Sequence, residues 1–139
     1  MINYVTYHDN ETKDYIDSLN KAVEVVTSSP KNIISIYAML FKIITGHNNI
    51  LNHLKSSIDS CEDECEKPSE CIEQIYQTAQ QFRDCFVGLH KTSLNSSLFF
   101  PFRYHLENAA IDWDDFAEDC AVASDPEIRE SLIRLANAI

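Results

Sequence analysis

The chain has 139 residues, 45 % of them hydrophobic, and a net charge of −11. This length suits a single domain over residues 1–139, which would bury roughly two-thirds of its unfolded surface. Two Gly and four Pro are too few for a turn-rich β protein or a disordered chain, and the negative charge argues against direct binding to nucleic acid.

The first helix is predicted from about Asn10, where apolar residues begin to recur at steps of three and four. These residues are Tyr15, Ile16, Leu19, Ala22, Val23 and Val26. Asn10 or Thr12 would cap its start, and the run 28–30 (Ser-Ser-Pro) would end it. Before it, residues 2–7 show the only short alternation that suits an extended segment.

A second, longer helix is predicted from Pro30, with Ser29 as its N-cap. Its apolar rhythm continues through Gly46, which favours one long helix, straight or bent there, over two short ones. The stripe comprises Ile33, Ile36, Tyr37, Leu40, Ile44, His47, Leu51, Leu54 and Ile58. We interpret His47, which lies on this stripe, as a hydrogen-bonded core or boundary residue. The acidic segment from Ser60 to Lys67 is predicted to be a connector.

A third helix is predicted from about Pro68, because apolar residues between Ile72 and Leu89 keep a helical register. Residues 91–95 are then expected to form a loop. The three long helices would pack as an antiparallel bundle.

Two or three short helices are expected after the bundle. The aromatic run 98–102 leads into a short helix that ends near Leu106, and Asp112 is predicted to begin another. The last helix has the clearest start signal, the sequence Ser-Asp-Pro-Glu at 124–127. Its apolar stripe consists of Ile128, Leu132, Leu135 and Ile139. The predicted fold class is therefore all-α.

The N-terminus shows no secretory signal, and the longest apolar stretch, 33–44, is too short and polar to span a membrane, so we expect a cytoplasmic location. The five cysteines are then expected to be reduced thiols. Cys61, Cys65 and Cys71 form the only cysteine array. Its spacing is unlike that of a zinc site, it has no nearby His, and the surrounding acids disfavour thiolates. We expect no metal or cofactor here, but free thiols, with a disulfide from Cys61 or Cys65 to Cys71 as the alternative.

Acidic residues are concentrated in two stretches. Residues 59–73 hold seven acids and one base, and residues 107–130 hold nine acids and one base. The second stretch does not fit a calcium-binding EF-hand, because Ala117 and Ala123 stand where the motif needs Gly and Glu. Charge this concentrated indicates a partner with a basic surface.

The leading hypothesis is an acidic protein-binding module that inhibits or regulates a partner protein. Immunity proteins, antitoxins and phage-type inhibitors of basic nucleic-acid-processing enzymes depend on this kind of electrostatic attraction. The predicted partner-binding residues are Asp112, Trp113, Asp114, Asp115, Glu118 and Asp119. Trp113 also fits the core, since it lies on the apolar side of its helix, and Tyr104 and Phe102 are secondary candidates.

Two alternatives remain open. Arg83, six intervening residues and His90 resemble the motif of HEPN-type helical ribonucleases, in which a polar residue often follows the Arg; here that residue is Asp84. That resemblance implies RNA contact by both residues at a dimer interface.

The other alternative is a structural assembly subunit with an exposed apolar surface around Phe99, Phe100 and Phe102. The chain shows no nucleophile motif and no phosphate-binding loop, so a binding protein is favoured over an enzyme. A homodimer is compatible with each hypothesis.

Overall fold

The computed structural model describes residues 10–27, 32–64 and 68–138, and the ordered elements within them are all helical. They are α1 (Asn10–Thr27), α2 (Ile33–Glu64), α3 (Pro68–Leu94), the 3₁₀ helix η1 (Ser97–Phe102), α4 (Arg103–Ser124) and α5 (Pro126–Ala138). The predicted all-α class is confirmed. In these ranges no helix is long and apolar enough to cross a membrane. The extended segment expected at 2–7 lies outside the described residues.

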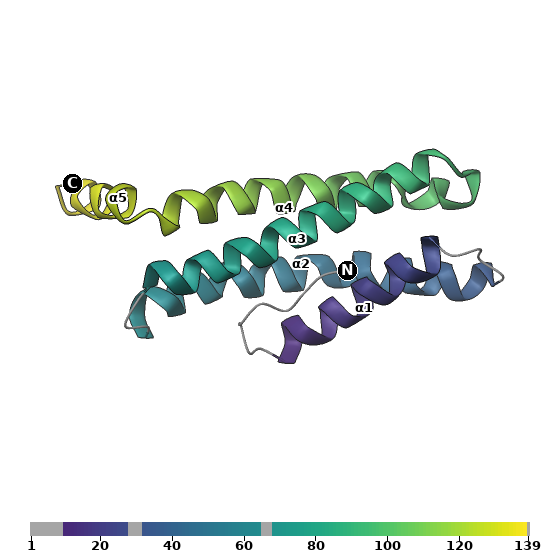
Figure 1. Cartoon of the computed structure of the whole chain (residues 1–139), viewed down its shortest axis with the longest axis horizontal. Helices are drawn as coiled ribbons and strands as arrows, with labels where there is room; N and C mark the ends of the chain where they lie inside the picture. Colours follow the sequence, from purple (N-terminus) through teal and green to yellow (C-terminus); the bar gives the residue numbers. More distant parts are fainter. Residues whose placement is uncertain (1–9, 28–31, 65–67, 139) are drawn as a thin grey trace.

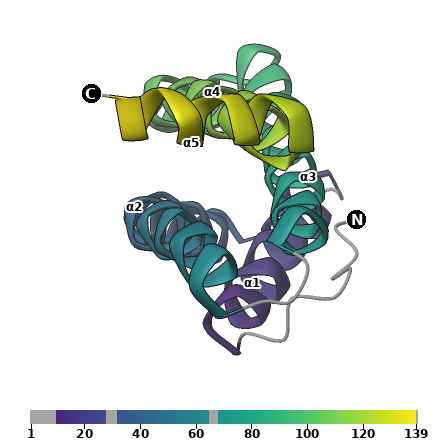
Figure 2. The ribbon, with the colours of Figure 1, turned by 90° about the vertical axis from the view of Figure 1, so that its left-hand side faces the viewer.

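The helices α1 to α4 run alternately up and down along one long axis (Figure 1). Viewed along that axis, α4, α3, α1 and α2 follow one another around an arc that encloses the core (Figure 2). The most extensive packing joins α3 to α4, whereas α2 and α4 meet along a smaller seam. α5 continues from the end of α4 and packs mainly on α4.

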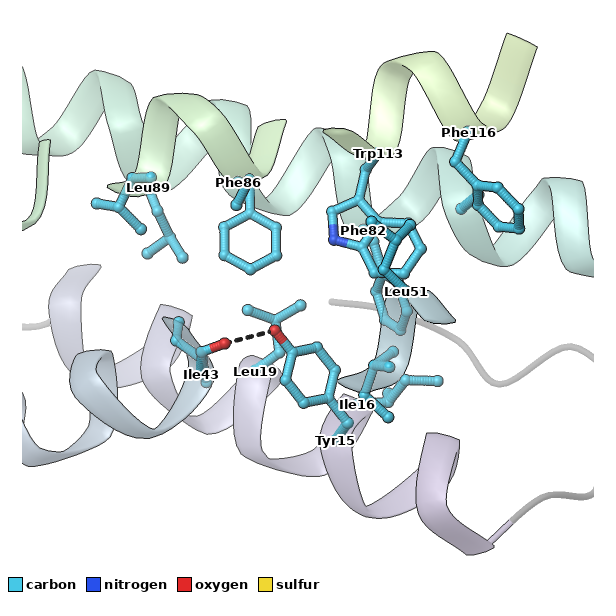
Figure 3. Packing of buried hydrophobic residues seen from close by; sticks show 14 of the residues in the cluster. Tyr15, Ile16, Leu19, Ile43, Leu51, Phe82, Phe86, Leu89, Trp113 and Phe116 are labelled. Carbon is cyan, nitrogen blue, oxygen red and sulfur yellow. Dashed lines mark hydrogen bonds between the residues drawn. The ribbon is translucent and has the colours of Figure 1, made fainter. Parts of the chain in front are cut away.

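The core is built from one buried face of each bundle helix and is rich in aromatic rings (Figure 3). Phe82 of α3 packs edge-on against Trp113 of α4, with ring centroids 4.7 Å apart. Tyr15 of α1 packs against the same Phe82 at 5.6 Å, and its hydroxyl donates a hydrogen bond of 2.7 Å to the carbonyl of Ile43 in α2. These contacts tie all four helices to one aromatic centre.

α2 is a single helix through Gly46, as the apolar rhythm predicted. Asn32 stands just before it, and its side-chain oxygen accepts a hydrogen bond from the backbone N–H of Ser35 at 3.2 Å. This is an N-cap contact, while the predicted cap, Ser29, lies outside the described residues. The predicted connector at 60–67 is wrong for residues 60–64, which continue α2. Glu is a good helix former, so local negative charge does not by itself end a helix.

The C-terminal half contains one long helix, α4, where two short helices were expected. Its buried residues recur at steps of three and four without a break, so one apolar stripe supports a single helix. They are Leu106, Ala109, Trp113, Phe116, Ala117 and Cys120. The expected loop at 91–95 is also wrong for residues 91–94, which extend α3 by one more turn.

α5 begins where the sequence predicted, and Asp125 supplies its cap. The Asp125 carboxylate accepts hydrogen bonds from the backbone N–H groups of Glu127 at 2.9 Å and of Ile128 at 3.3 Å. Ile128 and Leu135, from the predicted apolar stripe, are exposed. Neither of these two side chains therefore belongs to the core, and the other two residues of the predicted stripe, Leu132 and Ile139, lie outside the described side chains.

Candidate functional site

Trp113 belongs to the core and offers no side-chain surface to a partner. It is 0 % exposed, and its ring packs against those of Phe82, His47 and Phe116. The sequence was compatible with either a partner-binding or a core role for Trp113, and the structure places this residue in the core. Its neighbours on α4 are acidic, and they divide into groups that face different surroundings.

One group of α4 carboxylates faces α3. Asp114 lies 3.4 Å from a guanidinium nitrogen of Arg83, and Glu107 lies 3.7 Å from Nε2 of His90. Arg83 also donates two hydrogen bonds of 3.2 Å to Asp84. Partial burial lowers the pKa of Arg83, but the carboxylates of Asp84 and Asp114 outweigh it and leave that pKa raised. Both residues of the ribonuclease-like motif thus pair with carboxylates of α4.

Asp112 faces the opposite side of α4, where it meets α2. Nε2 of His47 lies 2.9 Å from a carboxylate oxygen of Asp112, although the two residues are 65 positions apart. His47 is only 6 % exposed, whereas Asp112 is partly exposed. The interpretation of His47 as a hydrogen-bonded core residue is therefore confirmed.

A small polar pocket opens beside this contact. Its volume is about 220 Å³, and we call it the α2–α4 pocket. It is lined by Ile44, His47, Asn48, His105, Asn108, Ala109 and Asp112. Deeper in the core, Nδ1 of His47 and Nε1 of Trp113 are both buried without a hydrogen-bond partner in the described chain. The ring centroids of these two residues are 5.6 Å apart.

The remaining acids of α4, namely Asp115, Glu118 and Asp119, point into solvent. Within the described ranges none of the three has an ion-pair partner, which distinguishes them from the acids that face α2 and α3. Their carboxylates are therefore available to a partner.

Large apolar side chains share this outward side of α4. Ile111, Asp115, Glu118 and Val122 follow one another at steps of four, three and four, so they lie along one stripe of the helix. Ile111 and Val122 are exposed, and Tyr104, seven residues before Ile111, is 70 % exposed. We call this surface the outer face of α4: Tyr104, Ile111, Asp115, Glu118, Asp119 and Val122.

The aromatic segment of η1 is only partly exposed. Phe99 is buried, and Phe102 is half-buried against the ring of Tyr37, with centroids 5.0 Å apart. Phe100 is 66 % exposed, and the guanidinium of Arg103 lies over its ring at 5.1 Å. Of the three Phe residues named for the assembly hypothesis, Phe100 alone presents an open side chain.

Metal binding finds no support among the described residues, where no group of three or more His, Cys, Asp or Glu is arranged to hold a metal ion. The side chains of Cys61 and Cys65 lie outside the description. Burial raises the pKa of both Cys85 and Cys120, the latter to about 12 with a further contribution from Asp119. Both thiols are therefore poor nucleophiles and poor metal ligands near neutral pH.

Sequence reasoning missed several residues of these surfaces, among them His105, Asn108, Ile111 and Val122. The stepwise pattern from Ile111 to Val122 is visible in the sequence, but it becomes a surface only when α4 is known to be continuous. Comparisons of the chain with protein-family models, curated proteins and solved structures give no match. Function is therefore inferred from the chain's own residues.

Proposed function

We propose that this chain is a binding protein that holds a basic partner protein on the outer face of α4 and thereby inhibits or regulates it. The main support is a set of three exposed carboxylates, Asp115, Glu118 and Asp119, which have no ion-pair partner among the described residues and lie on one side of a helix whose other side is core. Because α4 is anchored by its buried stripe, the backbone positions that carry these charges are fixed before a partner arrives. Such preorganisation reduces the entropy lost on binding.

The composition of the outer face also suits a protein partner. Tyr104, Ile111 and Val122 add exposed apolar area beside the acids. Protein interfaces typically combine an apolar or aromatic centre with charged residues at the rim, and Tyr is enriched among the residues that dominate binding energy. Tyr104, a secondary candidate from the sequence, is thus a better aromatic anchor than Trp113.

The net charge of −11 supports a basic target, since it would accelerate association with a positively charged surface. Enzymes that process nucleic acids have such surfaces where they bind phosphates. An immunity protein, an antitoxin or a phage-type inhibitor would use its carboxylates in this way. We also propose a cytoplasmic location, which agrees with the thiol state of Cys85 and Cys120.

The test is to capture the partner from the native host, purify it, and measure association kinetics at low and high salt. A triple variant reverses the free charges of the outer face: Asp115→Lys, Glu118→Lys and Asp119→Lys. We expect its association rate constant to fall at least about tenfold at low salt, with a smaller change in the dissociation rate, because rim charges act mainly on association.

A matched control changes the net charge equally at exposed positions far from α4 in the sequence. It carries Asp17→Lys, Glu24→Lys and Asp59→Lys, all on α1 or α2. The association rate constant of the control should fall only by the part of the electrostatic acceleration that depends on total net charge. If both triple variants slow association equally, or if neither does, the outer face of α4 is not the binding surface.

A further inference from the structure

We propose that the α2–α4 pocket receives an arginine side chain of the basic partner. This inference rests on the proposed function and assigns a specific anchoring point beside the outer face of α4. The pocket lies between two helices that are both fixed in the bundle. Its volume of about 220 Å³ corresponds to roughly seven water molecules at ~30 Å³ each, which is enough for one long side chain.

Asp112 gives the pocket its negative charge. One of its carboxylate oxygens accepts from Nε2 of His47, and the other has no hydrogen-bond partner in the part of the chain that the structure describes. No Lys or Arg is among the described residues that line the pocket. The wall therefore presents a carboxylate that is fixed in position by a buried His and retains a free acceptor.

The other polar side chains of the lining are Asn48, Asn108 and His105, and they come from both helices. Asn48 belongs to α2 and Asn108 to α4, and both side chains are exposed. Neither carboxamide has a hydrogen-bond partner elsewhere in the described residues. Their carbonyl oxygens, with the free oxygen of Asp112, supply acceptors from two directions.

This arrangement suits a guanidinium better than an ammonium group. Arginine presents five N–H donors in a fixed planar fork, so a single group can reach acceptors on both helices, whereas lysine is a compact point charge. The aliphatic part of an arginine would pack on Ile44 and Ala109, the apolar residues of the lining. A neutral side chain would leave the Asp112 charge uncompensated.

The pocket also continues into the free acids of α4. Asp112, Asp115 and Asp119 are spaced by three and four residues, so they share one side of the helix over about 10 Å. A partner segment with one arginine in the pocket could place its next basic residues opposite Asp115 and Asp119. The pocket would thus fix where the partner segment lies along α4, because charge attraction alone does not select one alignment.

The test uses the intact chain and a small probe, Nα-acetyl-arginine-N-methylamide, and does not require the partner. Binding is followed by nuclear magnetic resonance through the side-chain amide signals of Asn48 and Asn108. We expect saturable shifts with a dissociation constant in the millimolar range, as befits one side chain. The citrulline analogue, which is isosteric and neutral, should bind at least about tenfold more weakly, and the lysine analogue should also bind more weakly.

Three variants localise the binding. Asp112→Asn should weaken the arginine probe at least about tenfold, because it removes a charge-assisted hydrogen bond. Asn108→Phe should also weaken probe binding, because the larger side chain blocks the pocket. This variant keeps the His47–Asp112 contact, so it provides an independent test if Asp112→Asn folds poorly. Asp17→Asn is the matched control, because it removes the same charge from an exposed position on α1, outside the pocket lining and the outer face of α4. It should bind the probe within about twofold of wild type.

Equal binding of the citrulline or lysine analogue, unaltered binding by Asn108→Phe, or no saturable shift would overturn the pocket assignment. None of these outcomes bears on the charge-reversal test of the outer face, which leaves Asp112 intact. Conversely, arginine binding that depends on Asp112 would support the pocket even if reversing the outer-face charges had no effect on association.

Discussion

The chain's two glycines both lie inside long helices, but their surroundings differ. A Cβ added at Gly88 would meet no atom within 4 Å, whereas one at Gly46 would lie 3.3 Å from Cε2 of Tyr15. Tyr15 has little room to move, because its ring is buried against Phe82 and its hydroxyl is bonded to the carbonyl of Ile43. Gly46 therefore permits the close approach of α1 to α2.

This difference predicts opposite responses to the same substitution. Replacing Gly by Ala inside a helix normally stabilises a protein by about 0.8–1 kcal/mol, so Gly88→Ala should raise the free energy of unfolding by about that amount. In Gly46→Ala the same gain is opposed by overpacking against Tyr15, which costs about 1–3 kcal/mol. We expect a net change between about zero and a loss of 2 kcal/mol, measured by urea unfolding followed by far-ultraviolet circular dichroism.

A double-mutant cycle tests the cause. Tyr15→Leu removes the ring, so Gly46→Ala should stabilise that variant by about as much as Gly88→Ala stabilises the wild type. Equal stabilisation by the two alanines in the wild-type background, or no coupling between positions 15 and 46, would refute this account. The result also concerns the candidate site, because Gly46 immediately precedes His47 in α2.

Two further predictions concern alkaline pH and RNA. Burial raises the pKa of Tyr15 above 10.0 and that of Cys120 from 9.0 to about 12, so both stay protonated in the folded protein where the unfolded chain ionises. Their contribution to stability is present at lower pH and is lost as the pH rises above about 9 to 10. Above pH 10, Tyr15→Phe should make the free energy of unfolding fall less steeply with pH, by up to about 1.4 kcal/mol per pH unit. An unchanged pH slope of the unfolding free energy, measured with urea, would contradict this. For RNA, we expect wild type to cleave a fluorescent single-stranded substrate no faster than Arg83→Ala/His90→Ala, because both side chains pair with α4 carboxylates. Cleavage that both substitutions abolish would instead support the ribonuclease alternative.

The parts of the fold that could be predicted are those with a periodic stripe or a distinct cap. The apolar residues at steps of three and four from Tyr15 to Val26 predicted α1. Asp125 as a possible N-cap, followed by Pro126, predicted the start of α5. Two of the errors, at residues 60–64 and at the start of α4, occurred where acidic residues allow two interpretations. Asp112 suits the first turn of a helix, because acids favour its positive end, but it equally suits the exposed side of a helix that began earlier.

The candidate site was harder to predict than the fold, because its residues come from distant parts of the chain. His47 and Asp112 belong to separate amphipathic helices, and local spacing does not show which side of α2 faces α4. The α2–α4 pocket depends on that alignment and leaves no local pattern. Asp115, Glu118 and Asp119 could be predicted as exposed, because only composition and helical phase were needed.

The helical phase of α4 also explains why the predicted acids differ in their surroundings. Successive residues are turned by about 100°, so Asp112 and Asp114, on either side of the buried Trp113, point to opposite flanks of the helix. One flank meets His47 of α2 and the other meets Arg83 of α3, and both carboxylates are paired there. Asp115 and Glu118 lie between these directions on the side away from the core. The number of acids in α4 therefore overestimates the surface available to a partner, because some of these acids pair with residues of α2 and α3.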